Sequence, residues 1–113
     1  MKRVYLDNAA TTPLDKEVIA EMTNVMENSF GNPSAIHALG REVRTLVEKA
    51  RKTVANLLGA SPSEIFFTSG GTEADNTAIR CGISAYGIKH AITSKIEHHA
   101  VEHTLNMMLK NGE

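Results

Sequence analysis

The sequence has few of the residues that mark a disulfide scaffold, a membrane protein or a nucleic-acid binder. Its single cysteine, Cys81, cannot form a disulfide within the chain, which favours a reducing compartment. Tryptophan is absent, aromatic residues make up only 4%, and the formal net charge is -1. The chain therefore offers no base-stacking platform and no basic surface for nucleic acid or anionic lipid. We expect a cytoplasmic protein that binds neither nucleic acid nor membrane.

Long apolar runs are also missing. No stretch reaches the length of a membrane span, and the opening MKRVYLDNAATTP turns polar before an apolar run can form, which argues against a signal peptide. At 113 residues the chain is long enough for one modest core. The apolar spacing predicts four helices: one after an Asp15 cap, one capped by Ser34 that ends at Gly59, one over 72–86, and one from about Ala100.

Short β-favouring runs alternate with these helices at 3–6, 64–68 and 89–94. After residue 60 the order is strand, helix, strand, helix, which is typical of an α/β domain with a parallel sheet. Two strands cannot make such a sheet alone. We therefore expect the chain to be part of something larger or to associate with a partner.

The stretch FFTSGGTEADN, residues 66–76, passes from a β-favouring run through a glycine turn into a helical pattern. Such a turn places free backbone N–H groups at the positive end of a helix, where phosphate binds. Gly70 and Gly71 would let the backbone approach a phosphate, and Thr72 would add a hydroxyl. The alternative is an ordinary turn with a Ser69 cap, and local chemistry leaves both open.

Three histidines and two glutamates fall within IEHHAVEH, residues 96–103. His99 and His103 are spaced i, i+4 and could share a metal ion, but the spacing reveals no third ligand and the HExxH pattern is absent. The sequence therefore predicts no metal site. His98 follows a candidate strand, a position at which doubly wound folds present ligand-facing residues. Its planar ring could lie against a flat cofactor.

Two further positions have ordinary interpretations. Cys81 falls in the middle of a helix among small residues, so we expect a buried small side chain rather than a reactive thiol. His37 is expected to be a polar position on the second helix. Neither residue by itself indicates a function.

Four stretches together resemble one family. YLDNAATTP, FGNPSAIHALGR, EIFFTSGGTEADN and ITSKIEHHAV occur in the order found in cysteine desulfurases of the NifS/IscS type, which are pyridoxal-phosphate enzymes of the class V aminotransferase group. The resemblance covers essentially the whole chain. It implies an α/β fold, the N-terminal part of a pyridoxal-phosphate fold-type I transferase, with a parallel-rich sheet flanked by helices that is incomplete in this chain.

The resemblance also assigns roles to residues. Gly71 and Thr72 would bind the phosphate of pyridoxal 5'-phosphate, and His98 would stack on its pyridine ring and act in catalysis. Residues 1–14 would be an arm of the small domain, in which Asn8, Ala9 and Ala10 line the substrate mouth. Residues 15–113 would be the first part of the large cofactor-binding domain.

The activity implied for the full-length enzyme is removal of sulfur from L-cysteine, giving alanine and an enzyme persulfide. A homodimer and an iron–sulfur scaffold protein as sulfur acceptor are implied too. The family's Schiff-base lysine, persulfide cysteine, pyridinium aspartate and carboxylate arginine have no counterpart here, since Lys89, Lys95 and Cys81 lie outside those motifs. We therefore expect this chain alone to be inactive. The alternatives are another class V enzyme, such as a selenocysteine lyase or an aminotransferase-like relative, and a non-catalytic interaction module.

Overall fold

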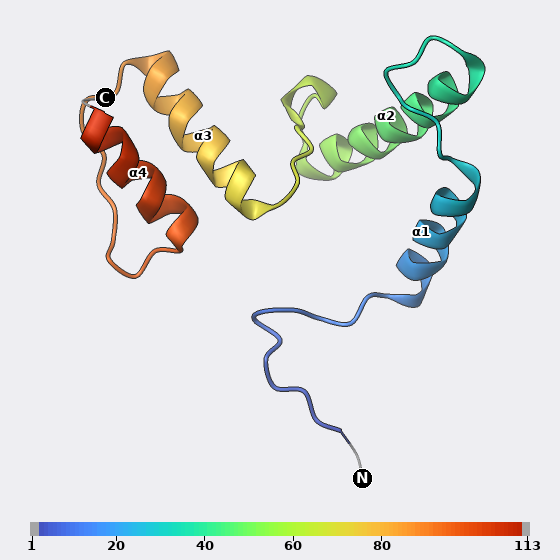
Figure 1. Ribbon diagram of the computed structural model, residues 1–113, viewed down its shortest axis with the longest axis horizontal. Coiled ribbons are helices and arrows are strands. Elements are labelled where there is room, and N and C mark those ends of the chain that lie inside the picture. Colours follow the sequence, from blue (N-terminus) through green and yellow to red (C-terminus); the bar gives the residue numbers. More distant parts are fainter. Residues whose placement is uncertain (1–2, 112–113) are drawn as a thin grey trace. The chain divides into compact units, whose positions relative to one another are not determined.

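The computed structural model describes residues 3–111, which contain four α-helices, one short 3-10 helix and no β-strand (Figure 1). The chain divides into two compact units, Met1–Ile65 and Phe66–Glu113. The first unit holds α1 (Lys16–Asn28), α2 (Ala38–Leu58) and the 3-10 helix η1 (Pro62–Glu64). The second unit holds α3 (Gly71–Tyr86) and α4 (His99–Asn111).

The expected parallel-rich sheet is not found in the described part of the chain. Residues 3–6 and 89–94 have no strand assignment, and the expected strand at 64–68 begins inside η1 instead. A strand needs a neighbour to receive its backbone hydrogen bonds, and no segment between residues 3 and 111 pairs with these runs. Phe66, in the middle of the second run, is 79% exposed.

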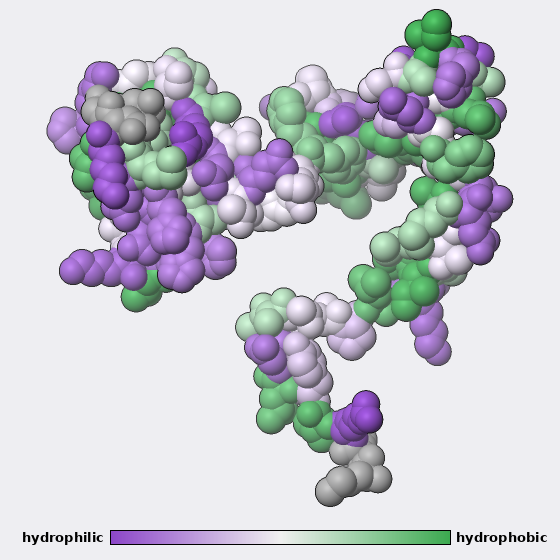
Figure 2. All heavy atoms as spheres, in the orientation of Figure 1, coloured by the Kyte–Doolittle hydropathy of each residue, from purple (hydrophilic) through white to green (hydrophobic). Residues whose placement is uncertain are grey.

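Helix α1 forms as its sequence predicts. The Asp15 side chain accepts a hydrogen bond from the Glu17 N–H at 2.9 Å, and the helix ends at the Ser29 cap. Its apolar positions face no other helix within residues 3–111, and Figure 2 shows hydrophobic atoms on its surface. The exposed apolar side chains of this helix are Val18, Ile19, Met22 and Met26. The amphipathic pattern therefore has no partner within the described chain.

Helix α2 begins at a different cap from the one expected. His37, not Ser34, is the N-cap, and its Nδ1 accepts from the Gly40 N–H at 3.4 Å. Ser34 belongs to a separate turn, because its N–H donates to the Asn32 side chain at 2.9 Å. Ser34 and His37 both have a side chain that could cap the helix. His37 does so, because the bond to Asn32 holds Ser34 in the turn.

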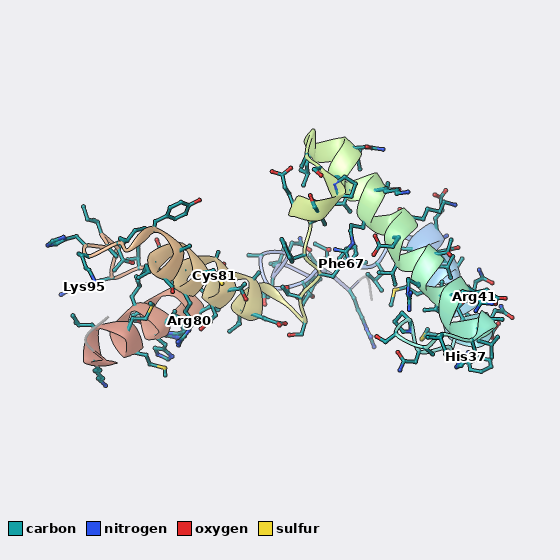
Figure 3. All side chains as sticks on the ribbon, turned by 90° about the horizontal axis from the view of Figure 1, so that it is seen from above. His37, Arg41, Phe67, Arg80, Cys81 and Lys95 are labelled. Atoms are coloured by element: carbon teal, nitrogen blue, oxygen red, sulfur yellow. The ribbon has the colours of Figure 1, made fainter. Side chains whose placement is uncertain are left out.

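One glycine and two arginines hold this turn against the start of α2. A Cβ at Gly40 would lie 2.6 Å from the carbonyl oxygens of both Asn32 and Ala35, so only glycine fits the close approach. Arg44 Nε donates to the Pro33 carbonyl at 2.8 Å, and Arg41 donates to the Ile36 carbonyl. The side chains of His37 and Arg41 are labelled at this end of α2 in Figure 3.

The far end of α2 is closed by local contacts. Gly59 is its C-cap, with a left-handed φ of 65°, and η1 follows with a capping box between Ser61 and Glu64. Arg51 donates to the Ile65 carbonyl and pairs with Glu48 at 3.1 Å. These contacts fold η1 back onto the helix.

In the second unit, α3 and α4 pack side by side and run in the same direction (Figure 1). The buried side chains of α4 are Ala100, Thr104 and Met108, spaced by four residues along one face. Thr104 is 2% exposed, and its hydroxyl lies 2.5 Å from Asn76 Oδ1 of α3. The connection between two parallel helices has to return along their length, which residues 88–98 do.

One face of α3 consists of small residues, Ala74, Ala78, Cys81 and Ala85, and it is exposed rather than buried. Cys81 is exposed, which overturns the expectation of a buried side chain, and Figure 3 shows it on α3 next to Arg80. The helix packs on α4 through other positions, and residues 3–111 contain no sheet that could cover this face. No helix within those residues is both long and apolar enough to cross a membrane.

Candidate functional site

The N-terminus of α3 has backbone donors that no side chain caps. Its N-cap is Gly70, which makes no side-chain cap hydrogen bond. Ala74 donates to the Gly70 carbonyl at 3.1 Å and begins the ladder of the helix. The N–H groups of Gly71, Thr72 and Glu73 precede that ladder, so helix geometry gives them no partner within α3. These N–H groups form the positive end of the helix dipole, where an anion binds.

The alternative that Ser69 caps this helix is wrong. The Ser69 hydroxyl and N–H both donate to Glu73 Oε2, each at 2.7 Å. The backbone N–H of Ser69, and then its hydroxyl, hold the pKa of the Glu73 carboxyl below its ordinary value. Glu73 thereby fixes the turn before α3 while using donors other than those of Gly71 and Thr72.

Open space surrounds the two glycines of this turn. A Cβ built at Gly70 or at Gly71 would meet no atom of the chain within 4 Å. Gly70 has an extended backbone, with φ 165°, which any residue can adopt. The fold therefore does not itself require glycine at these positions, and a side chain there would project into the space from which an anion approaches.

His98 stands at the N-terminus of α4. Its carbonyl accepts from the N–H groups of Val101 and Glu102, at 2.9 and 3.2 Å, so it occupies the cap position. Its Nδ1 accepts from the Ala100 N–H at 3.2 Å. In the neutral ring this bond leaves the proton on Nε2, the nitrogen on the far side of the ring.

A chain of hydrogen bonds connects the two helix starts. Asn76 Nδ2 donates to the Thr72 carbonyl at 2.7 Å, and Asn76 Oδ1 lies 2.5 Å from the Thr104 hydroxyl. The same hydroxyl lies 2.8 Å from the Ala100 carbonyl. Asn76 and Thr104 each stand five residues into their helices, and both helices run in the same direction (Figure 1). The starts of α3 and α4 therefore lie at one end of the pair.

The predicted cofactor residues thus share an end of the second unit. Gly71 and Thr72 open α3, and His98 opens α4. Two helix dipoles present their positive ends there, together with free N–H groups and an imidazole ring. These are suitable groups for the phosphate and the flat ring of a phosphorylated cofactor. Lys95 lies in the connection just before α4 (Figure 3).

The predicted substrate-mouth residues belong to the first unit. Asn8, Ala9 and Ala10 form an exposed turn in which the Ala10 N–H donates to the Asp7 carbonyl at 3.1 Å. The Tyr5 hydroxyl lies 3.0 Å from Thr11 Oγ1 and closes this turn from outside. No contact of Asn8, Ala9 or Ala10 tests their predicted role.

A third group was missed by sequence reasoning. His99, Glu102 and His103 bring one candidate ligand atom each to within 4.8 Å of one another on the surface of α4. The HExxH pattern places its glutamate directly after the first histidine, so it does not describe this group. Glu102 is instead three residues after His99, and this i, i+3 spacing was the available signal.

The sequence pattern of the aminotransferase class-V family matches residues 4–112. A cysteine desulfurase IscS of Dictyoglomus turgidum is 53% identical over 99% of this chain. A putative cysteine desulfurase IscS 1 of Bacillus subtilis is 50% identical over 99% of it. A solved NifS-like protein is 42% identical over 98% of the chain and superposes with a TM-score of 0.87.

The chain spans only part of these relatives: 29% of the Dictyoglomus protein, 30% of the Bacillus protein and 31% of the NifS-like structure. The matches confirm the resemblance drawn from the four motifs, and they cover both units. The chain belongs to the aminotransferase class-V family, and its relatives within that family include cysteine desulfurases of the NifS/IscS type.

Proposed function

We propose that this chain serves as the phosphate-binding part of a pyridoxal-phosphate-dependent cysteine desulfurase, which removes sulfur from L-cysteine. The observation that carries the proposal is the uncapped start of α3, at the same end of the helix pair as His98. The matches to cysteine desulfurases of the IscS type support it. The rest of the enzyme would lie in the more than two thirds of the relatives' length that the chain does not span.

The phosphate would be held by the N–H groups of Gly71 and Thr72 and by the Thr72 hydroxyl. Each charge-assisted hydrogen bond of this kind contributes about 1.5–3 kcal/mol. The turn is already ordered before binding, because Glu73 holds Ser69 and Asn76 holds the Thr72 carbonyl. Little conformational entropy would then be lost when the phosphate binds.

His98 would have two roles. Its ring would lie against the cofactor ring, and its Nε2, the nitrogen not engaged by Ala100, would give and take a proton near the reacting atoms. When bound, the cofactor would withdraw electrons from the amino-bearing carbon of cysteine, which makes release of the sulfur on the neighbouring carbon possible. The residues of this chain would bind and orient it.

Several further features belong to the same proposal. Residues 1–14 would form the arm carrying Asn8, Ala9 and Ala10 to the substrate mouth, and residues 15–113 would begin the large domain. The enzyme would be a cytoplasmic homodimer that passes sulfur to an iron–sulfur scaffold protein. The lysine that binds the cofactor and the cysteine that accepts sulfur would come from outside this chain. The chain alone would then make no alanine from cysteine.

The proposal is tested by cofactor retention in a protein that carries this chain within the full family length. We expect Thr72→Ala to weaken retention by about 1.5–3 kcal/mol, which is roughly 10- to 150-fold. Gly71→Val should weaken it more, because its side chain would fill the space in front of the turn. Thr77→Ala, further along α3, is the matched control. Equilibrium dialysis measures all three, and wild-type retention in both Thr72→Ala and Gly71→Val would refute the proposal.

A further inference from the structure

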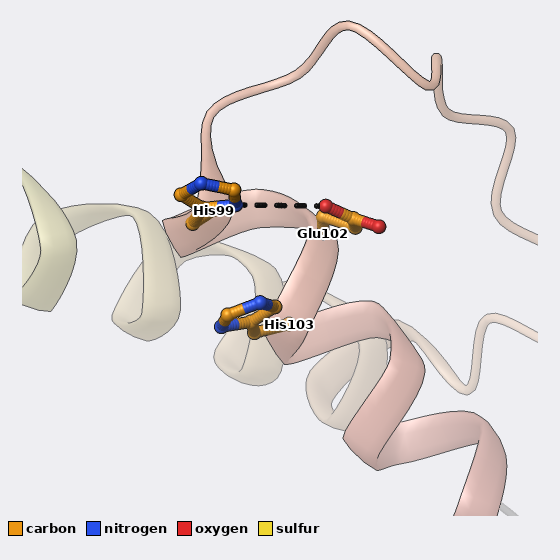
Figure 4. A group of neighbouring side chains, drawn as sticks. All are labelled: His99, Glu102 and His103. Atoms are coloured by element: carbon orange, nitrogen blue, oxygen red, sulfur yellow. Dashed lines mark ion pairs between the residues drawn. The ribbon is translucent and has the colours of Figure 1, made fainter.

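We propose that His99, Glu102 and His103 form a surface site for a divalent transition-metal ion of the zinc type. The three side chains stand on consecutive turns of one face of α4 (Figure 4). Within the part of the chain that the structure describes, they are the group of histidine, cysteine and carboxylate side chains placed closely enough to share an ion. The site has no part in the proposed cysteine desulfurase activity.

The three donor atoms lie within 4.8 Å of one another, near the separation that a shared ion imposes. The His99 and His103 rings are stacked one turn apart, with centroids 5.2 Å apart and planes 25° from parallel. His99 Nδ1 lies 3.7 Å from Glu102 Oε2. Ligand atoms about 2.0–2.1 Å from a tetrahedral ion are roughly 3.3 Å from one another. His99 Nδ1 and Glu102 Oε2 are therefore about half an ångström farther apart than a tetrahedral ion requires.

The remaining adjustment requires only side-chain rotation. The side chains of His99 and Glu102 are 79% and 45% exposed, so no packed neighbour opposes their movement. The helix itself fixes the Cβ positions at i, i+3 and i+4, which are neighbours on its surface. His98 is not one of the group, and its Nδ1 accepts from the Ala100 N–H.

The chemistry of the donors defines the ligand. Two imidazole nitrogens and one carboxylate oxygen suit zinc, nickel and copper ions, whereas calcium and magnesium prefer oxygen donors throughout. Three protein ligands leave a fourth position of a tetrahedral ion open to water.

Zinc binding to the 113-residue chain tests the proposal. Every protein in the series carries Cys81→Ala, because an exposed thiol is itself a zinc ligand. Affinity is measured by competition with a zinc-sensitive dye, and ring nitrogen signals of the histidines are followed by NMR. The variants are His99→Ala, His103→Ala, the double variant and Glu102→Gln. His90→Ala is the matched control, since His90 lies outside the group.

We expect one zinc ion per chain, with shifts at the rings of His99 and His103. Loss of a second-shell partner alone weakens metal sites about 10- to 100-fold, so each single histidine variant should lose at least about tenfold. Glu102→Gln should weaken binding by less, His90→Ala should bind as its parent does, and urea that melts α4 should abolish binding. The proposal would be overturned if His99→Ala or His103→Ala bound zinc as tightly as the parent protein. It would also be overturned if the parent bound zinc no more tightly than the double variant. Undiminished affinity in urea would overturn it as well.

Discussion

Glu73 is the residue whose titration depends most plainly on the turn before α3. Its carboxylate accepts from the N–H and the hydroxyl of Ser69, and these bonds lower its pKa. A carboxyl whose pKa is lower in the folded state stabilises that state at every pH above the ordinary glutamate pKa. This contribution is lost as the pH falls through the lowered folded-state value.

The first prediction concerns this carboxyl. Ser69→Ala removes the hydroxyl bond and keeps the backbone bond, so the pKa of Glu73 should rise part of the way toward its ordinary value. A pH titration of the Glu73 side-chain carbon by NMR measures both midpoints. A wild-type midpoint at or above that of Ser69→Ala would show that the hydroxyl does not stabilise the carboxylate.

His98 allows its chemical role to be separated from its role as a helix cap. In the full-length enzyme, His98→Ala should lower turnover by about 10²- to 10⁴-fold, as expected for a lost acid–base group. His98→Asn restores a good cap for α4 but supplies no imidazole, so turnover should remain low while the helix is kept. Steady-state kinetics and far-UV circular dichroism measure the two effects. Recovery of turnover in His98→Asn would mean that His98 acts only as the cap of α4.

His99→Ala and His103→Ala are the controls for that experiment. Neither side chain caps α4, and both rings lie on its exposed surface. We expect turnover close to wild type in both variants. A large loss in His99→Ala with little loss in His98→Ala would place the catalytic histidine one position later than we propose.

Single residues also explain why some site features were predictable and others were not. The glycine turn before Thr72 is contiguous in sequence, so its phosphate-binding chemistry could be inferred directly. The exposure of Cys81 depends on what packs against α3, which no local pattern reveals. The choice of His37 over Ser34 as a cap depends on Asn32 binding the Ser34 N–H first.

The pairing of α3 with α4 depends on a polar contact between two helices. Thr104 is buried, and its hydroxyl lies within reach of Asn76 Oδ1 and of the Ala100 carbonyl. Thr104→Val keeps the shape and removes the hydroxyl, which leaves the half-buried Asn76 Oδ1 without this partner. We expect a loss of about 1–3 kcal/mol in the free energy of unfolding.

Thr53→Val provides the matched comparison for that change. The Thr53 hydroxyl donates to the Lys49 carbonyl at 3.0 Å, the same i−4 bond, but on an exposed face with no partner helix. Its loss should cost about 0.5 kcal/mol or less, as for other surface substitutions. Urea denaturation followed by circular dichroism compares the two variants. Equal losses would mean that the Asn76 contact contributes nothing to helix pairing.

Two helical glycines should respond in opposite directions to the same substitution. Gly40→Ala places a Cβ 2.6 Å from two carbonyl oxygens, so it should destabilise the first unit by about 1–3 kcal/mol. Gly82→Ala meets no atom within 4 Å on α3 and should stabilise that helix by up to about 1 kcal/mol. Thermal melting at the helix signal gives both signs. A stabilising Gly40→Ala would mean that the turn at 32–35 does not pack on α2.

Helices were predictable to within a few residues because their signals are local. Asp15 caps α1, and Gly59 and Gly87 end α2 and α3 with left-handed backbones, as their sequence positions predict. Strands failed because pairing is not local. The runs around Phe66 and Ile92 have β-favouring composition, but the segments that would pair with them do not lie within residues 3–111.

At the scale of the whole molecule, most of the large apolar side chains in the described residues are exposed. Only Ala55, Ala100 and Met108 are buried apolar side chains within the described residues, whereas Phe30, Phe66 and Ile92 are largely exposed. These side chains leave apolar surface in contact with water, which association would remove. The chain also spans less than a third of the relatives it matches. We expect concentration-dependent self-association, which sedimentation velocity would measure.

Phosphate binding at the open start of α3 can be measured on this chain by nitrogen-15 NMR. Pyridoxamine phosphate is the probe, because it has the ring and the phosphate but no aldehyde that could react with lysines. Pyridoxamine, which lacks the phosphate, is the control. We predict saturable shifts at the amides of Gly71, Thr72 and Glu73 with the phosphorylated compound alone, and their loss in Gly71→Val. Shifts centred elsewhere, or equal shifts with both compounds, would contradict the assignment of this helix end as the phosphate site.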